Sequence, residues 1–461
     1  MIERGIREAR KHFIPPQDFD GYRSRIARSY GHGPNKTVRR LLSDTEHPGN
    51  NERSMAHLHP PPAIPALQAA AVEGLGNENT IIGQASPISS ALEAESIAWV
   101  LQHLVPFDRV RASGNITTGG TRSNETALVI AQRRSLARGI EEAGVIFTSE
   151  LAHYSLNKGA TTIAGISGIE TIPSVPGAYH MDPERLEEML AKAKRNGLPV
   201  HAVVALAGAT ETGTFDPLKE IAAITKDYDV FLHVDAAYGG PYKLSERGHF
   251  LEGLELADSV TLDGHKFLFT GYNCGILVVK DSADHALITA LNETGDSYLP
   301  GLNGNGGKRT GLSDHVGGNR LDGSLGGHSV ARLHAVISNL GVDTLSILLN
   351  HTIDLTDYAA AMIRSDESPF ELCYTPQINT VSFMPRNENH RVAALLEATS
   401  EKVKEQTGYW VSTDRLPVYT NGRTHVETVF RIVPSHPYTE TGDIEAALGH
   451  IQTVFKHEAD R

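Results

Sequence analysis

The stretch Ser259-Val-Thr-Leu-Asp-Gly-His-Lys-Phe267 decides how this sequence is interpreted. It begins with a short hydrophobic run that is typical of a buried strand, and Lys266 follows the point where that strand would end. An earlier stretch, Asp229-Val-Phe-Leu-His-Val-Asp-Ala-Ala-Tyr238, has the same form and carries Asp235 at its own strand end. The sequence therefore predicts an acid and a lysine at the ends of two neighbouring strands.

This pair of side chains suits the chemistry of pyridoxal phosphate (PLP). A lysine amine forms a Schiff base with the cofactor aldehyde, and a carboxylate holds a proton on the pyridine nitrogen. The protonated ring accepts electrons from the substrate Cα, where a carbanion would otherwise be poorly stabilised. We therefore expect PLP as the cofactor, with Lys266 and Asp235 in catalytic roles.

Strand-like and helix-like segments alternate between residues 112 and 285. Strand-like runs lie at 145–149, 201–206, 230–234, 259–262 and 275–279, and helical patterns lie at 125–136 and 183–194. A further helical pattern, at 90–104, precedes them. Such alternation predicts an α/β domain with a mostly parallel sheet. Ligands of such sheets bind at the carboxyl ends of the strands, where Asp235 and Lys266 are both expected.

The chain is too long for one hydrophobic core, so we expect several parts. Residues 1–75 are polar and weakly periodic, which predicts an N-terminal arm that packs on another surface, such as a second subunit. Residues 76–340 would form the large domain, including a long Gly-rich loop over 292–327. Residues 341–461 would form a smaller α/β domain, with strands at 379–383 and 429–433 and a closing helix at 441–455.

Composition narrows the class of protein. The net charge of −13 comes from 42 basic and 55 acidic residues spread along the chain, which argues against nucleic-acid binding. The two cysteines, Cys274 and Cys373, have no metal-ligand spacing and fit a reducing compartment. No apolar run is long enough to cross a membrane. We expect a cytoplasmic enzyme that acts on a small molecule and binds neither nucleic acid nor membrane.

Four further segments agree with the Asp–Lys pair. They are the Gly-rich turn Asn115-Ile-Thr-Thr-Gly-Gly-Thr-Arg-Ser-Asn-Glu125, then Glu150-Leu-Ala-His-Tyr-Ser155, Gly208-Ala-Thr-Glu-Thr-Gly-Thr-Phe-Asp216 and Leu321-Asp-Gly-Ser-Leu-Gly-Gly-His328. The first opens a helix, where free amides and the helix dipole favour a phosphate. A plain strand-to-helix connection, and an ordinary strand-end histidine at His153, are the alternatives. The order of the segments and their strand-end positions favour a shared site.

Together these segments resemble the PLP-dependent amino-acid decarboxylases of fold type I, group II, which include aromatic amino acid, histidine, plant serine and archaeal tyrosine/aspartate decarboxylases. The resemblance covers roughly residues 59–450, and its most specific element is His233-Val-Asp-Ala-Ala-Tyr-Gly-Gly240 followed by Asp263-Gly-His-Lys-Phe267. It implies a large domain with a mostly parallel sheet of the seven-stranded type, a smaller C-terminal α/β domain and an N-terminal arm.

The resemblance also implies roles for individual residues. Lys266 would form the internal aldimine, Asp235 would pair with the pyridine nitrogen, and His153 and Ala237 would cover the two faces of the ring. The phosphate would lie among Thr118, Gly120 and Thr121 with His265 beside it, and Thr210 would lie near the ring hydroxyl. Ser324 would reach the phosphate from the neighbouring subunit, which implies a homodimer with its active site at the subunit interface.

Two further residues have alternative interpretations. Tyr298 matches a family tyrosine that helps to position or protonate the quinonoid intermediate, and a packing role is the alternative. Arg431 lies where many fold type I enzymes bind the substrate carboxylate, and the alternative is a solvated strand-end arginine. The chain departs from the family at Arg122, usually Glu, at Leu325, usually Arg, and in the Gly-rich 301–318 segment.

The resemblance implies α-decarboxylation of an L-amino acid to the amine and CO₂. A PLP-dependent carbon–carbon or β-eliminating lyase, or a decarboxylation-linked oxidative deaminase, would use the same cofactor residues. A binding protein built on the PLP fold is a rival that the intact Asp235–Lys266 pair disfavours. A metal enzyme is disfavoured because the near-pair His57 and His59 has no nearby carboxylate set.

Overall fold

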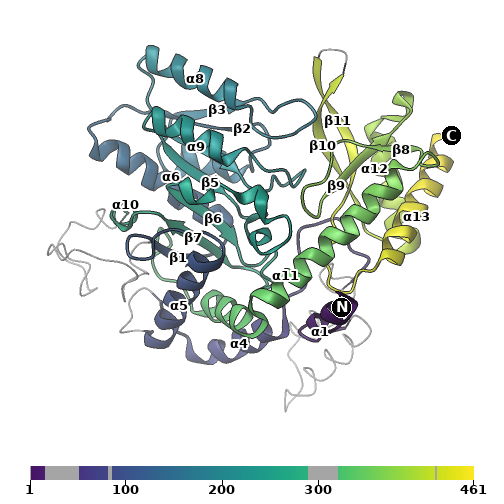
Figure 1. Cartoon of the computed structure of the whole chain (residues 1–461), viewed down its shortest axis with the longest axis horizontal. Helices are drawn as coiled ribbons and strands as arrows, with labels where there is room; N and C mark the ends of the chain where they lie inside the picture. The colour runs from purple at the N-terminus through teal and green to yellow at the C-terminus, as the bar shows by residue number, and fades with distance from the viewer. Residues whose placement is uncertain (1, 16–50, 81–85, 289–319, 421–422, 461) are drawn as a thin grey trace. The chain divides into compact units, whose positions relative to one another are not determined.

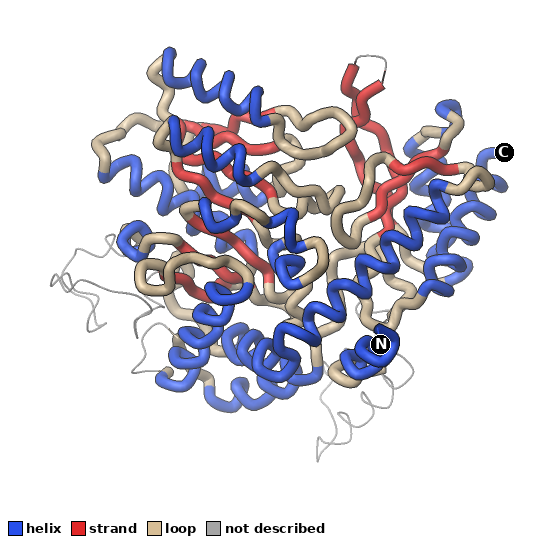
Figure 2. The backbone as a smooth tube through the Cα atoms, in the orientation of Figure 1, coloured by secondary structure: helices blue, strands red, loops and turns tan. Residues whose placement is uncertain are grey.

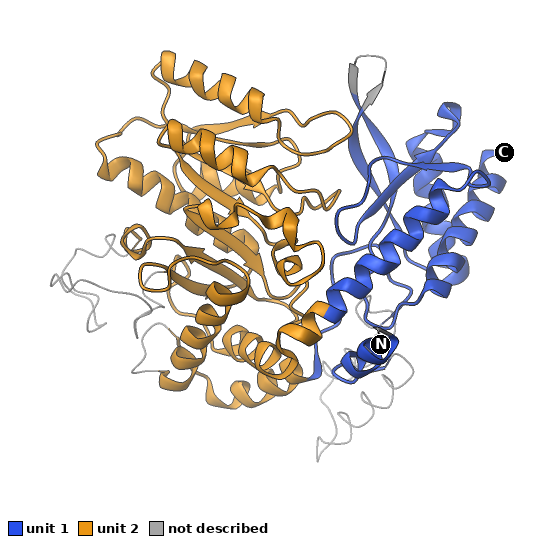
Figure 3. Cartoon of the chain, viewed as in Figure 1, with its two compact units in different colours: residues 1–64, 347–461 blue, residues 65–346 orange. Residues whose placement is uncertain are grey.

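The computed structural model describes residues 2–15, 51–80, 86–288, 320–420 and 423–460. The chain divides into two compact units (Figure 3). Unit 1 contains residues 1–64 and 347–461, and unit 2 contains residues 65–346. The predicted domain borders, at 75 and 340, lie near these divisions, but the N-terminal segment belongs with the C-terminal part of the chain.

A seven-stranded sheet forms the centre of unit 2 (Figures 1 and 2). In pairing order its strands are β1 (Ser113–Thr117), β7 (Gly275–Val279), β6 (Ser259–Asp263), β5 (Phe231–Asp235), β4 (Val200–Leu206), β2 (Val145–Ser149) and β3 (Gly168–Ile172). Strands from β6 to β3 pair in parallel, whereas β7 runs antiparallel to both β1 and β6. This confirms the predicted mostly parallel sheet.

Helices surround this sheet (Figure 1). They are α4 (Ile64–Gly76), α5 (Pro87–His103), α6 (Gly120–Ala137), α7 (Ser155–Lys158), α8 (Pro183–Arg195), α9 (Leu218–Asp227), α10 (Ser282–Ala286) and the first part of α11 (His328–Arg364). Short helical turns cover Gly159–Ile163, Gly240–Leu244, Gly248–Leu251 and Leu254–Leu256. The predicted cap of α8 is present, since Asp182 Oδ1 accepts the backbone N–H of Glu184 (3.0 Å). Helix α6 packs against the sheet, because its Leu128 and Ile130 lie in one buried cluster with Val204 of β4.

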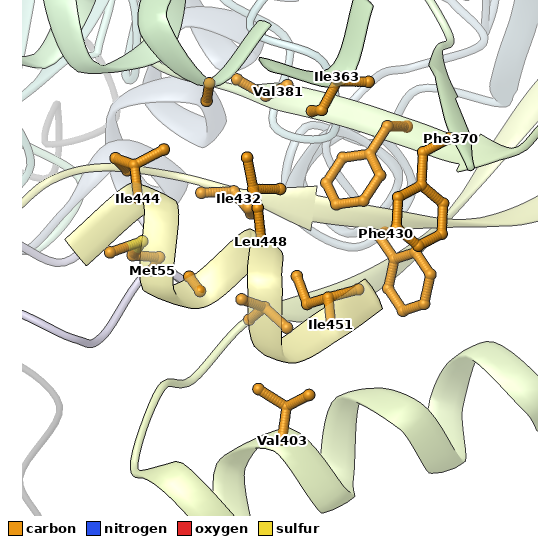
Figure 4. Packing of buried hydrophobic residues seen from close by; sticks show 14 of the residues in the cluster. Met55, Ile363, Phe370, Val381, Val403, Phe430, Ile432, Ile444, Leu448 and Ile451 are labelled. Atoms are coloured by element: carbon orange, nitrogen blue, oxygen red, sulfur yellow. The ribbon is translucent and has the colours of Figure 1, made fainter. Parts of the chain in front are cut away.

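Unit 1 contains an antiparallel sheet of four strands in the order β10 (Ser412–Thr420), β11 (Arg423–Ile432), β9 (Val381–Pro385) and β8 (Phe370–Leu372). Its helices are α1 (Ile2–Arg10), α12 (Ala393–Thr407), α13 (Thr441–Ala459), the short turn Glu388–His390 and the second part of α11. Phe370, Phe430 and Ile451 lie in one buried cluster with Met55 (Figure 4). These apolar side chains form the core of unit 1.

The N-terminal segment pairs with this unit through its backbone. Met55 donates its N–H to Trp410 O (2.7 Å) and accepts from Val433 N (2.8 Å). Arg10 Nε donates to Pro437 O (2.7 Å). Met55 is also fully buried, so this part of the N-terminal segment contributes to the core of unit 1.

Helix α11 continues from unit 2 into unit 1 and bends at Gly341, which has φ +65°. By length and composition alone, helix α11 could cross a membrane. A core helix of a soluble protein can have the same length and composition, and Leu355, Ala359 and Ile363 of α11 are buried in the unit 1 core.

Candidate active site

The candidate site lies at the carboxyl edge of the large sheet. Asp235 is the last residue of β5, and Asp263 is the last residue of β6, which pairs with β5 in parallel. Lys266 follows β6 within a tight turn, as predicted. The loop after β1 leads through Gly119 into α6 at the same edge, where open α/β sheets bind ligands.

Lys266 is held by a carboxylate that the sequence analysis did not single out. Its Nζ lies 3.2 Å from Asp263 Oδ2, and its side chain is only 15% exposed. The other oxygen, Asp263 Oδ1, accepts the backbone N–H of Gly120 (2.6 Å). Asp263 therefore links the lysine to the first residue of α6. Its strand-end position in the quoted stretch was the signal that could have identified it.

Asp235 is buried and receives two hydrogen bonds. Its Oδ1 accepts the backbone N–H of Ala237 (3.1 Å), and its Oδ2 accepts Nδ2–H of Asn124 on α6 (2.7 Å). The two hydrogen bonds hold the carboxylate in one orientation. Asp235 is thus a buried, positioned carboxylate of the kind that pairs with a pyridine nitrogen.

His153 follows β2 and lies within electrostatic reach of this pair. Burial lowers the pKa of His153, while the charge of Asp235 raises that pKa and the charge of Lys266 lowers it. Its Nδ1 lies 2.8 Å from Ser155 Oγ. The structure thus brings together the three side chains that were expected to hold the reactive part of the cofactor.

The Gly-rich turn places its backbone very close to the strand ends. Gly119 has φ +152°, a conformation that favours glycine, and a Cβ on Gly120 would lie 2.9 Å from Asp263 Oδ2 and 3.1 Å from Ala237 Cβ. The Gly120 N–H already donates to Asp263, so an incoming phosphate would depend on other donors of the turn. Thr118 is exposed and Thr121 half-buried, and their phosphate roles stay predictions.

His265 is buried next to Asp263. Its Nδ1–H donates to Cys274 O (3.0 Å), its Nε2 lies 3.6 Å from Asp263 Oδ2, and its ring stacks on Tyr272 with centroids 4.0 Å apart. Burial lowers the pKa of His265 and raises the pKa of Tyr272 to about 12, so the neutral forms of both rings are favoured. Neither ring carries charge near neutral pH.

Thr210 lies half-buried in the turn after β4. Asp216 holds the end of this turn, because its two carboxylate oxygens accept the N–H groups of Met181 (2.6 Å) and Leu206 (2.7 Å). Burial raises the pKa of Asp216 to about 6. The proposed contact of Thr210 with a cofactor stays a prediction.

Ser324 is exposed, and its Oγ accepts Nδ2–H of Asn79 (3.1 Å). The unusual Arg122 binds the same segment, with Nε 2.8 Å from Asp322 Oδ1 and NH1 2.7 Å from Glu125 Oε2. Arg122 therefore ties the start of α6 to the segment that carries Ser324. The role of Ser324 in a neighbouring subunit stays a prediction.

Arg431 and Tyr298 are the two remaining candidates. Arg431, on β11 of unit 1, is 10% exposed, and it donates to Asp414 Oδ2 (2.7 Å), Ser412 Oγ (3.2 Å) and Ala56 O (3.1 Å). These contacts favour a structural role over the capture of a substrate carboxylate. Tyr298 and the 301–318 segment lie outside the described residues.

The described residues fit PLP. They supply a buried carboxylate at Asp235, a partly buried amine at Lys266, a neutral imidazole at His153 and a glycine-rich helix start at Gly119 and Gly120. This set matches the Schiff-base lysine, pyridinium partner and phosphate turn that PLP requires. Within the described part of the chain, no group of three or more metal-binding side chains was found.

A family model described as the pyridoxal-dependent decarboxylase conserved domain matches residues 37–386. The chain belongs to this family. PLP is the cofactor of the family, and Asp235 and Lys266 both lie within the matched residues. The resemblance inferred from the sequence is therefore confirmed.

Relatives within the pyridoxal-dependent decarboxylase family have several substrates. An L-2,4-diaminobutyrate decarboxylase of Rhizobium meliloti (strain 1021) is 41% identical over 50% of this chain and 46% of its own length. Another, of Acinetobacter baumannii, is 29% identical over 77% of this chain and 71% of its own length. An aspartate 1-decarboxylase of Aliivibrio fischeri is 31% identical over 71% of this chain and 63% of its own length. The chain thus spans only about half of the first relative and under three quarters of the others.

Solved structures share the fold. One is the glutamate decarboxylase domain of diaminobutyrate-pyruvate transaminase and L-2,4-diaminobutyrate decarboxylase from Vibrio parahaemolyticus. Its TM-score is 0.73 at 22% identity, and the match covers 99% of this chain and 94% of that one. Oryza sativa TDC with PLP and tryptamine has a TM-score of 0.78 at 22% identity, covering 92% and 88%. These likenesses confirm fold type I.

Proposed function

We propose that this protein is a PLP-dependent decarboxylase that converts an L-amino acid into an amine and CO₂. The observation that carries the proposal is the meeting of Lys266, Asp235 and His153 at one sheet edge in a chain of the pyridoxal-dependent decarboxylase family. When bound, PLP would supply an electron sink for the bond that breaks at Cα.

The chain's own residues would bind, orient and protect the reacting groups. Asp235, held by Asn124 and Ala237, would keep the proton on the pyridine nitrogen. His153 would lie against the ring as a neutral imidazole, because burial lowers its pKa. Asp263 would hold the Lys266 amine beside the sheet edge, 3.2 Å from its own Oδ2. Burial of these groups excludes water and strengthens their electrostatic effects.

A visible spectrum and a product assay test this proposal. Wild type and Lys266→Ala are incubated with PLP, and then with L-2,4-diaminobutyrate, L-aspartate, L-tyrosine and L-tryptophan, while CO₂ and ammonia are measured. A visible band that needs Lys266, with CO₂ release from one substrate and no ammonia, supports the decarboxylase. A Lys266-dependent band with ammonia or an aldehyde, with or without CO₂, would replace it with another PLP reaction. Absence of the band would overturn the cofactor assignment.

The proposal includes a homodimer in which Ser324 completes the partner's site. Its support is the exposed position of Ser324 on a segment held by Arg122 and Asn79. We would mix inactive Lys266→Ala and Ser324→Glu chains. If each site combines the lysine of one chain with the serine of the other, mixed dimers regain one intact site. If activity does not return although mixed dimers form, Ser324 does not act across subunits.

The proposal also keeps the cytoplasmic location that composition suggested. Cell fractionation with an antibody against the chain would test it. Recovery of the protein in a membrane or secreted fraction would contradict this part.

A further inference from the structure

Asn124 is the centre of a buried hydrogen-bond network that the sequence analysis did not identify. It lies on the first turns of α6 and is 1% exposed. Its Nδ2 lies 2.7 Å from Asp235 Oδ2 and 3.4 Å from Ser155 Oγ, and its Oδ1 lies 3.0 Å from His233 Nε2. One amide therefore joins three elements of the sheet edge.

The direction of each hydrogen bond follows from the Asp235 carboxylate. A carboxylate only accepts, so the NH₂ group of Asn124 must face Asp235 and its oxygen must face His233. His233 then donates from Nε2, which leaves Nδ1 as the acceptor of Ser259 Oγ–H at 2.8 Å. Burial lowers the pKa of His233 to about 4, so the ring is neutral near pH 7. The contact with Asn124 Oδ1 selects the tautomer that carries its proton on Nε2.

A second branch joins Asn124 to the predicted ring-stacking histidine. His153 Nδ1 faces both the hydroxyl of Ser155 (2.8 Å) and its backbone N–H (3.3 Å), so Nδ1 is the acceptor. The Ser155 hydroxyl proton is directed at His153, and a lone pair of the same oxygen faces Asn124. The predicted partner of the pyridine nitrogen and the predicted ring-stacking side chain thus depend on one amide.

We propose that Asn124, oriented by His233 and Ser259, is a positioning residue that holds the Asp235 carboxylate in place and aimed at the pyridine nitrogen. This inference rests on the proposed function, because it concerns the same cofactor site. The Asn124 N–H stabilises the negative charge of Asp235 and blocks its rotation. Among the described residues, loss of the amide would leave the Ala237 N–H as the donor to the Asp235 carboxylate. Asp235 would then bind a protonated pyridine nitrogen less firmly.

The test uses loaded protein and a readout other than activity. Wild type and variants are loaded with PLP labelled with ¹⁵N in the ring, and the ¹⁵N chemical shift reports whether that nitrogen carries a proton. The dissociation constant of PLP is measured by titration. Asn124→Leu removes both amide contacts at nearly constant volume. We expect its ¹⁵N signal to move toward that of an unprotonated pyridine and its PLP affinity to fall about 10- to 100-fold, as for a lost hydrogen bond to a charged group.

His233 gives a second route that leaves Asp235 and Asn124 unchanged. His233→Leu removes the donor that orients the amide and should shift the ¹⁵N signal in the same direction. His233→Gln can donate to Asn124 and accept from Ser259, so it should restore the wild-type signal. His201, a buried histidine at the start of β4 that accepts the Gly144 N–H, provides the matched control. We expect His201→Leu to lower stability without moving the ¹⁵N signal.

The outcomes distinguish a failure of the proposed function from a failure of the positioning role of Asn124. If wild type shows no Lys266-dependent visible band with PLP, the proposed function fails and the role of Asn124 falls with it. If wild type shows the band while Asn124→Leu and His233→Leu keep its ¹⁵N signal and PLP affinity, only the positioning role is overturned. Should Asn124→Leu fail to fold, the comparison of His233→Leu with His233→Gln decides.

Discussion

Replacing Glu93 with Gln should destabilise unit 2 by about 3–5 kcal/mol. Glu93 on α5 forms an ion pair with Arg320, and the two side chains are 1% and 0% exposed. Glu93 Oε1 also accepts the backbone N–H of Ile116 in β1 (2.7 Å), and Arg320 NH1 donates to Thr80 Oγ1 (2.6 Å). The substitution keeps the side-chain volume but leaves the Arg320 charge buried without its counter-ion.

The estimate follows from burial rather than from the attraction between the charges. A surface ion pair contributes about 0–1 kcal/mol, whereas removal of one partner of a buried pair leaves a charge that water cannot reach. Replacing both partners with apolar side chains removes the stranded charge. We therefore expect Glu93→Leu combined with Arg320→Met to be less destabilised than Glu93→Gln alone, although the Ile116 N–H still loses its acceptor.

Urea unfolding followed by tryptophan fluorescence measures this effect in unit 2 alone. The chain has two tryptophans, and Trp99 lies on α5 close to Glu93, whereas Trp410 lies in unit 1. In a Trp410→Phe background, Trp99 reports the unfolding of unit 2, and Glu93→Gln should lower the urea midpoint by about 1 M. A midpoint shift too small to resolve, or a double variant destabilised at least as much as Glu93→Gln, would refute the reasoning.

Gly275→Ala would place a Cβ 2.3 Å from the backbone carbonyl carbon of Gly119. We therefore expect lower stability in thermal unfolding and weaker PLP binding in a PLP titration. Gly449→Ala, which has open space around it, should leave both unchanged. The pKa of His233 in the folded protein, about 4, lies below its ordinary value of 6.5. Its contribution to stability is therefore present above pH 6.5 and is lost as the pH falls toward 4. The unfolding free energy of His233→Gln should accordingly depend less steeply on pH over this range. Arg431→Met should lower the stability of unit 1 by about 3 kcal/mol, followed by Trp410 fluorescence, and leave KM unchanged. A raised KM at unchanged stability would instead favour the carboxylate-binding role.

Much of the fold was predictable because local patterns express it directly. The strand-like runs at 145–149 and 275–279 match β2 and β7, and the Asp182–Pro183 start of α8 is present. Two short strands were missed, β1 (Ser113–Thr117) and β3 (Gly168–Ile172). Their pairing with neighbours far away in the sequence, rather than local preference, makes them strands.

The sequence by itself determined the class of protein and the two residues with the most specific chemistry. Lys266 and Asp235 were predictable because a reactive side chain directly after an apolar run must lie at a strand end, and parallel strands place those ends at one edge. Family membership added the cofactor. Neither conclusion depends on knowing which side chains touch.

Only the tertiary structure decided what surrounds those two residues. Asn124 reaches Asp235 because α6 starts at the same sheet edge, although the two lie far apart along the chain. Asp263 contacts both Lys266 and the Gly120 amide, and Arg431 forms an ion pair instead of remaining exposed. Hydrogen bonds and ion pairs act over only a few ångströms, so which polar groups become partners depends on how the chain packs, and sequence spacing does not contain that information.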